Sequence, residues 1–128
     1  MPREGRKRRD DPARDPAWLM DMLTAAVRVQ KFVSGRTLEQ YLADEMLRSA
    51  VERQVEIIGE AARGLTEAFR TAHPQIPWAP IMAQRHRLAH EYDEINPNLI
   101  WNVATVHVPA LIEMIRPLIP PIPPERES

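Results

Sequence analysis

The sequence predicts an all-α fold, a bundle of about five or six helices that forms a dimer. Apolar residues recur at helical spacing in several segments, and cap residues and prolines separate these segments. Strand-like alternation occurs only in VATVHV, inside a longer helical pattern. The 128 residues, 44% of them hydrophobic, suit one domain with a modest core. Apolar residues on several helix faces favour burial of some of them in a symmetric dimer.

The first half of the chain is expected to hold two long helices and a short one. Asp15-Pro16 resembles an N-cap followed by a proline at the first helical position, and Gly35 is expected to end that helix. Residues 37–40, TLEQ, fit a capping box that starts a short helix. Asp44 is then expected to cap a long amphipathic helix through about Arg63.

The second half begins with a helix expected from about Thr66 to Ala72. A rigid connector comes next, because it contains Pro74, Pro77 and Pro80, and one of the last two is expected to open the next helix. Asn96-Pro97 is another cap followed by a proline, and it precedes a long apolar helix that Pro109 should kink.

Both ends of the chain differ from this helical domain, which is predicted over residues 14–119. Residues 1–13 read as a disordered basic tail, and residues 120–128 as a proline-rich, frayed tail. The chain up to Arg14 carries a net charge of +3 and the remainder −4. An acidic body argues against a duplex-binding protein with a large basic surface, although it allows a small, local RNA site.

Several classes of protein are excluded or disfavoured. The chain has no cysteine, which excludes disulfides and thiolate chemistry. The N-terminus lacks the apolar region of a signal peptide, and no uninterrupted apolar run approaches the roughly 18 residues that span a bilayer. We expect a cytoplasmic protein without membrane contact. There is no glycine-rich phosphate loop and no G-x-S-x-G elbow, so no cofactor is expected.

The stretch RHRLAHEY, residues 85–92, concentrates the polar groups that phosphate chemistry uses. His86 and His90 are four residues apart and share a helix face, which would suit zinc. However, the HExxH pattern is absent, and His73 and His107 are remote in the sequence. No metal site is predicted.

RNA cleavage fits the same residue types better, because RNA carries its own nucleophile, the 2′-hydroxyl. The protein must supply a base, an acid and positive charge for the phosphorane-like transition state. Histidine can act as base or acid near neutral pH, and arginine offers a forked cation that matches phosphate oxygens. Arg85, His90 and Tyr92 have suitable side chains.

Spacing alone leaves the geometry open, since Arg85 and His90 lie about 140° apart on a straight helix. The helix could loosen near Ala89 and His90, the long arginine could reach around, or a dimer could bring two copies to one cleft. A polar helix end that makes only salt bridges is an equally strong interpretation of the spacing.

These residues also resemble a known family. Arg85-x4-His90-x-Tyr92 matches the RX4HXY motif of HepT-like toxins in the HEPN superfamily. Residues 21–65, which include IIGEAA, resemble the family's N-terminal helices. HPQIPWAPI resembles its connector, and EYDEINPNLIWNVATVHVPAL resembles its segment from the end of the motif onward. The resemblance extends from about Arg14 to Leu118.

The resemblance implies an all-α homodimer with the motif facing a cleft between protomers. It implies the toxin of a type VII toxin-antitoxin system, a metal-independent endoribonuclease with Arg85 and His90 as catalytic residues. It also implies an antitoxin partner, an MntA-like nucleotidyltransferase that adds AMP to Tyr92. Such a modification would place bulk and negative charge beside the residues that receive RNA.

The chain departs from the commonest family pattern beside the motif. His86 stands where asparagine is usual, and Ala83-Gln84 replaces Gly-Met. His86 and Arg87 are expected to position RNA or to assist proton transfer. An alternative is a catalytically inactive HEPN module that binds a nucleotidyltransferase or a nucleotide. Gly59, in IIGEAA, is expected to permit close approach of two helices.

Overall fold

The computed structural model describes residues 11–90 and 95–120, and for residues 86, 87, 89 and 90 it describes the backbone alone. Within these residues the chain is all-α and contains no strand. The elements are the 3-10 turn η1 (Pro12–Arg14), α2 (Asp15–Val33), α3 (Leu38–Ala43), α4 (Glu45–Gly64), α5 (Glu67–Ala72), α6 (Trp78–His90), α7 (Pro97–Asn102), the π-helical segment η3 (Val103–His107), α8 (Val108–Ile115) and η4 (Arg116–Leu118). Because α7, η3 and α8 are continuous, the described chain forms six helices, and the predicted all-α bundle is confirmed.

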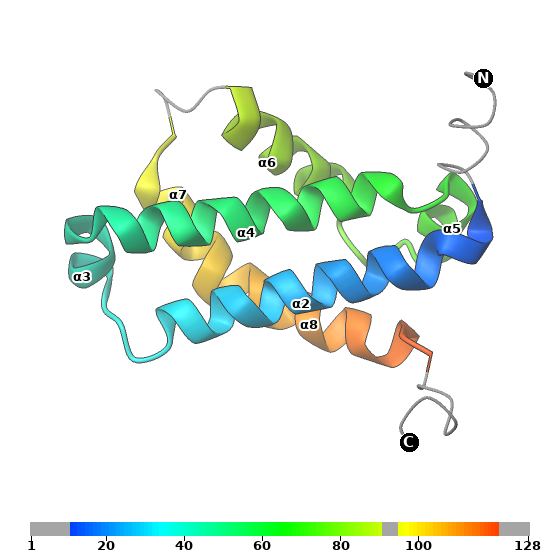
Figure 1. The fold of residues 1–128 in the computed structure, drawn as a ribbon, viewed down its shortest axis with the longest axis horizontal. Coiled ribbons are helices and arrows are strands. Elements are labelled where there is room, and N and C mark those ends of the chain that lie inside the picture. The colour runs from blue at the N-terminus through cyan, green and yellow to red at the C-terminus, as the bar shows by residue number, and fades with distance from the viewer. Residues whose placement is uncertain (1–10, 91–94, 121–128) are drawn as a thin grey trace.

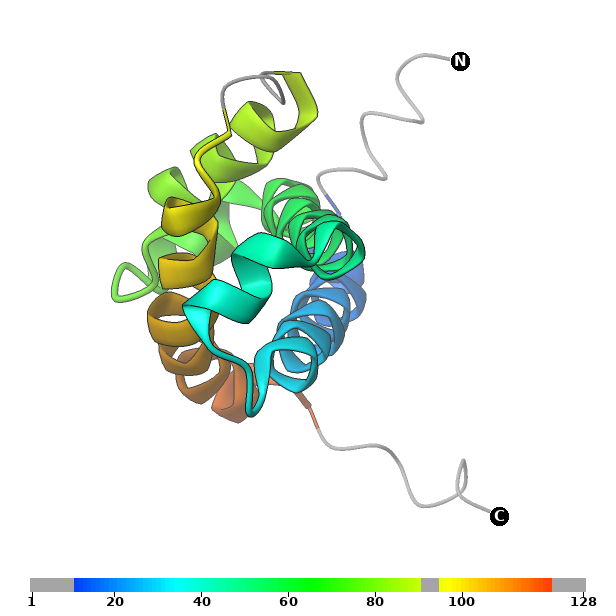
Figure 2. The ribbon, with the colours of Figure 1, turned by 90° about the vertical axis from the view of Figure 1, so that its left-hand side faces the viewer.

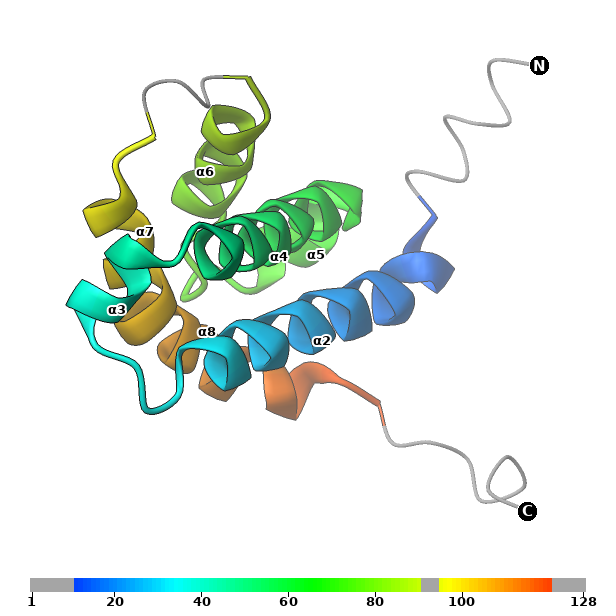
Figure 3. The ribbon, with the colours of Figure 1, turned by 60° about the vertical axis from the view of Figure 1, so that its left-hand side comes forward.

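Two long helices, α2 and α4, lie antiparallel and side by side (Figure 1). Helix α8 packs against α2, and α6 packs against α4 on the side away from α2 (Figure 3). The short helix α3 covers one end of the bundle next to α7, as the end-on view shows (Figure 2). Helix α4 therefore joins the core of the bundle to the helix that carries RHRLAH, residues 85–90.

The core lies between α2, α4 and the α7–α8 helix. Its largest fully buried side chains are Tyr41, Leu19, Met22, Ile76, Ile100, Ile115, Val29, Val51 and Val108. Burial of this apolar surface, at about 25 cal/mol per Å² removed from water, is the main stabilising contribution to the bundle.

Most of the predicted helix ends are confirmed. Thr37 and Gln40 form a complete capping box, with N···O distances of 3.1 and 3.0 Å. The Asp44 carboxylate accepts a hydrogen bond from the Leu47 N–H at 3.0 Å, and Asn96 caps α7 in the same manner. Gly35 lies just after α2 with a φ of 74°, which glycine adopts without strain.

The predicted start of α2 is wrong by one residue. Arg14 occupies the N-cap position, and Asp15 is the first residue of the helix. The Asp15 carboxylate is buried and accepts hydrogen bonds from the Thr66 N–H and the Thr66 hydroxyl, both at 2.9 Å. Because Thr66 in turn caps α5 by accepting from the Phe69 N–H, Asp15 joins the starts of two helices.

Pro109 was expected to kink the α7–α8 helix, and the structure has the π-helical segment Val103–His107 just before this proline. Proline lacks an N–H and its ring clashes with the preceding turn, so the wider turn accommodates it. The whole helix, Pro97–Leu118, is long and apolar enough to cross a membrane by length and composition alone, a test that core helices also pass. Here its buried residues pack against α2.

Candidate active site on helix α6

Helix α6 begins directly after Pro77, whose carbonyl accepts a hydrogen bond from the Ile81 N–H at 3.2 Å. Trp78 anchors this start, since it is buried and its indole N–H donates to the His73 carbonyl at 2.9 Å. Of the two prolines expected to open this helix, Pro77 therefore precedes it and Pro80 lies within its first turn. The rigid connector thus fixes where the motif helix starts.

The side of α6 that holds Ile81 and Arg85 rests on Gly59 of α4. A Cβ added at Gly59 would overlap the Cβ of Arg85 and lie 2.9 Å from the Ile81 carbonyl oxygen. The expectation that Gly59 permits close helix approach is confirmed. The stretch IIGEAA is thereby connected directly to the motif arginine.

The guanidinium of Arg85 is not neutralised by any described carboxylate. The two ion pairs within residues 11–90 and 95–120 are Arg36–Asp44, at 3.7 Å, and Arg53–Glu56, at 3.0 Å. Arg85 is half-buried, and its Nε has no hydrogen-bond partner among the described atoms although it is buried. Arginine keeps its charge at physiological pH, so this cation, which no described residue neutralises, can meet an anionic ligand.

The structure describes fewer atoms of the other predicted site residues. Tyr92 lies outside the described residues, and His86, Arg87 and His90 are described by their backbone alone. That backbone is α-helical through His90, so the helix does not loosen between Arg85 and His90. Positions 85 and 90 therefore remain about 140° apart around the helix axis. The remaining two explanations are a long reach of Arg85 and a second copy of the chain.

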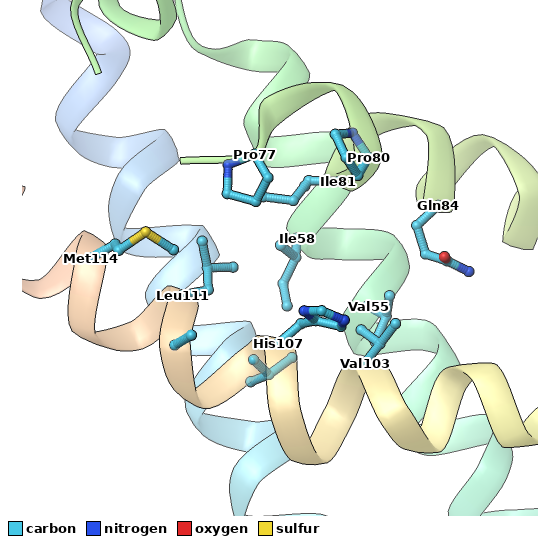
Figure 4. Close-up of a pocket in the computed structure, with 12 residues that line it drawn as sticks. Val55, Ile58, Pro77, Pro80, Ile81, Gln84, Val103, His107, Leu111 and Met114 are labelled. Atoms are coloured by element: carbon cyan, nitrogen blue, oxygen red, sulfur yellow. The ribbon is translucent and has the colours of Figure 1, made fainter. Parts of the chain in front are cut away.

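A cavity of about 340 Å³ lies beside the motif, between α4, α6 and the α7–α8 helix (Figure 4). Its lining is largely apolar, and Gln84 and His107 supply its polar side chains. The Asn102 amide lies 3.4 Å from the His107 ring nitrogen. This cavity was not predicted from the sequence, in which Gln84 stands out only as a departure from the family pattern and His107 only as a remote histidine. The available signal was the spacing of Pro77, Pro80, Ile81 and Gln84 along one helix face.

The described residues contain no group of three or more histidine, aspartate or glutamate side chains placed to hold a metal ion. The expectation that RHRLAHEY holds no metal stays a prediction, since the side chains of His86 and His90 are not described.

Comparisons with known proteins agree on one family. Residues 22–118 match the family described as Ribonuclease HepT-like. A Methanocaldococcus jannaschii protein named "Putative RNase" is 35% identical over 112 residues, 88% of this chain and 93% of its own. A Thermococcus cleftensis protein named "Probable ribonuclease HepT" is 31% identical over 94 residues, 73% of this chain and 86% of its own. No solved structure matches. The family resemblance is confirmed, and this chain belongs to the HepT-like ribonuclease family.

Proposed function

We propose that this protein is a cytoplasmic endoribonuclease, the toxin of a type VII toxin-antitoxin system, which cuts RNA without a metal through Arg85 and His90. The observation that carries the proposal is Arg85, a half-buried guanidinium that no described carboxylate neutralises, in the motif helix of a HepT-like ribonuclease. A fixed cation stabilises the charge that develops on phosphate oxygens during cleavage.

The reaction needs only groups that the chain and RNA supply. The 2′-oxygen attacks phosphorus and passes its proton to a histidine, while the bond from phosphorus to the 5′-oxygen breaks. The 5′-oxygen takes a proton from a second acid, and the products are a 2′,3′-cyclic phosphate and a 5′-hydroxyl. Arg85 stabilises the phosphorane-like transition state, and His90 exchanges protons near neutral pH. His86 and Arg87 position the RNA backbone.

A homodimer explains how residues on different sides of α6 act together. Because α6 is helical through His90, positions 85 and 90 point about 140° apart within one protomer. A symmetric contact between two copies brings Arg85 of one protomer towards His90 of the other.

Tyr92 is the residue through which the antitoxin switches off the nuclease activity. An MntA-like nucleotidyltransferase would transfer AMP to the tyrosine hydroxyl, with loss of pyrophosphate from ATP. The added phosphate is anionic and would compete with RNA for Arg85.

The activity is tested by incubating unmodified protein with labelled RNA in EDTA. We expect cleavage with cyclic phosphate ends, lost in Arg85→Ala and in His90→Ala but kept in the surface control Arg28→Ala. Products with 5′-phosphate ends would contradict the mechanism. A folded, unmodified protein that leaves RNA intact would instead favour the inactive module that binds a nucleotidyltransferase or nucleotide.

The composite site is tested by mixing the two inactive variants after mild dissociation. If each centre uses Arg85 and His90 from different protomers, mixed dimers contain one intact centre, and about a quarter of wild-type activity returns. If both residues act within one protomer, no activity returns.

The control mechanism is tested by intact mass after co-expression with a nucleotidyltransferase encoded beside the gene. We expect added AMP and loss of nuclease activity in the wild type, and neither in Tyr92→Phe. An unchanged mass in the wild type would remove this part of the proposal.

A further inference from the structure

Gly59, on the neighbouring helix α4, lies directly beneath the stem of Arg85. We propose that Gly59 is a positioning residue for Arg85, because its missing side chain sets the height and rotation of α6 at the motif. The inference rests on the proposed role of Arg85 in cleavage. It gives a function to IIGEAA, a stretch remote from the motif in sequence.

The contact at Gly59 involves atoms that cannot move independently of α6. An added Cβ would overlap the Cβ of Arg85 and lie 2.9 Å from the Ile81 carbonyl oxygen and 3.0 Å from the Cγ of Arg85. The first two atoms are fixed to the α6 backbone, so rotating a side chain does not relieve the overlap. Carbon atoms in contact lie about 3.5–4.0 Å apart, so α6 would have to move by roughly 1 Å or more.

No hydrogen bond or ion pair with a described residue fixes the Arg85 side chain. Its Nε is buried and has no hydrogen-bond partner among the described atoms, and no described carboxylate pairs with its guanidinium. Helix α6 packs mainly against α4. The contact at Gly59 is therefore the described feature that positions the stem of Arg85.

The chain offers a matched control in Gly64, on the same helix. Gly64 is also buried, and a Cβ added there would overlap the indole of Trp18, with 2.8 Å to its Cζ2. Alanine at either position raises helix propensity and creates a steric overlap. Only the overlap at Gly59 is with α6.

The experiment compares kcat and KM for RNA cleavage by Gly59→Ala and Gly64→Ala, with thermal unfolding to establish the folded fraction. Displacement of a catalytic group by about 1 Å typically costs about a hundredfold in rate. We expect that loss in kcat for Gly59→Ala, with little change in KM, and near wild-type kcat for folded Gly64→Ala. Equal kcat values for the two variants would overturn the inference.

A double-mutant cycle separates positioning from a general structural effect. In the Arg85→Ala background, Gly59→Ala should cause a much smaller further loss of the residual activity, because the guanidinium that Gly59 positions is already gone. Losses that multiply would overturn the inference. In NMR spectra, the Arg85 Nε–H should exchange with solvent faster in Gly59→Ala than in the wild type, and unchanged exchange would also overturn it.

If Gly59→Ala does not fold, Gly59→Ala combined with Arg85→Gly tests the contact directly. This combination removes both Arg85 atoms that the added Cβ would approach. The Ile81 carbonyl oxygen stays close to the added Cβ, so the measure is the folded fraction relative to Gly59→Ala alone. A gain in folded fraction supports the inference, and no gain overturns it. Wild-type protein that does not cleave RNA would refute the proposed function separately, while the NMR comparison would still test the contact.

Discussion

The α2–α4 pair and helix α6 differ in how they are held in the bundle. Seven residues of α2 and eight of α4 are buried, whereas Trp78 and Leu88 are the buried ones among the described side chains of α6. Helix α6 rests mainly on α4, on the outer side of the pair (Figure 3). The comparison indicates that the long pair supplies most of the stability, while the motif residues occupy a helix with one principal neighbour.

The largest effect is expected for Arg85→Ala, and it should fall on the cleavage rate and not on stability. Arg85→Ala should lower the cleavage rate about a thousandfold, since it removes a preorganised cation from the transition state. Its thermal unfolding midpoint should stay near that of the wild type, because no described ion pair is lost. A variant that is inactive because it has unfolded would show instead that Arg85 belongs to the stabilising part.

Met22→Ala in α2 is expected to lower stability and to leave the cleavage rate unchanged. Met22 is fully buried, and truncation of such a side chain costs about 3 kcal/mol in the free energy of unfolding. Denaturant unfolding measures this loss, and kcat per folded molecule should not change. A matched control is Met20→Ala, because Met20 is 40% exposed on the same helix.

The buried pair Asp15–Thr66 should be the next most sensitive contact. Asp15→Ala leaves the Thr66 N–H and hydroxyl without their buried acceptor, at a cost of about 2 kcal/mol in the free energy of unfolding. The exposed Asp21 on the same helix provides the control, and Asp21→Ala should change the unfolding midpoint little. Similar losses in the two variants would show that the contact is not stabilising.

Caps should have smaller effects. Asp44→Ala removes the acceptor for the Leu47 N–H and should lower the free energy of unfolding by about 1 kcal/mol. Asp44→Asn, measured in the same denaturant titration, should recover most of this loss, because asparagine is an equally good cap. If Asp44→Asn is as unstable as Asp44→Ala, the salt bridge to Arg36 contributes more than the cap.

The smallest effect at neutral pH is expected for Tyr41→Phe. Burial, together with the nearby Glu52 carboxylate, raises the pKa of Tyr41 above its usual range, although Arg48 acts in the opposite direction. Above a pH of about 10 the unfolded tyrosine ionises while the folded one stays protonated, so stability falls as pH rises. Tyr41→Phe should reduce this alkaline loss. Unfolding midpoints at neutral and alkaline pH measure it, and equal losses in both proteins would contradict the assignment.

The sequence predicted the fold well where local chemistry decides structure. Residues 37–40 and Asp44 carry their own cap partners within one turn, so their roles are visible in the sequence. Asp15 was assigned wrongly because its partner, Thr66, is 51 residues away along the chain. Apolar periodicity likewise cannot reveal which helix α6 contacts.

The candidate site was predicted less completely than the fold. The motif and the family were identified from residues 85–92 and the segments around them, and the family is confirmed. The close approach at Gly59 was also predicted, but its partner, Arg85, required the three-dimensional structure. The roles of His90 and Tyr92 stay predictions, because their side chains are outside the described part of the chain.

The π-helical segment has a consequence for how this chain tolerates changes in length. Buried residues of the C-terminal helix recur every fourth position at Ile100, Ala104, Val108 and Ile112. On an ideal α-helix each such step drifts by about 40°, so the buried stripe would wind away from α2. The wide turn at Val103–His107 absorbs part of that drift, as one inserted residue would. Loss of one residue within this turn would keep both halves of the stripe aligned, and its cost would be confined to the fit of Pro109 in a regular helix. Loss of one residue from the middle of α2 or α4 would instead rotate half of a buried face into solvent.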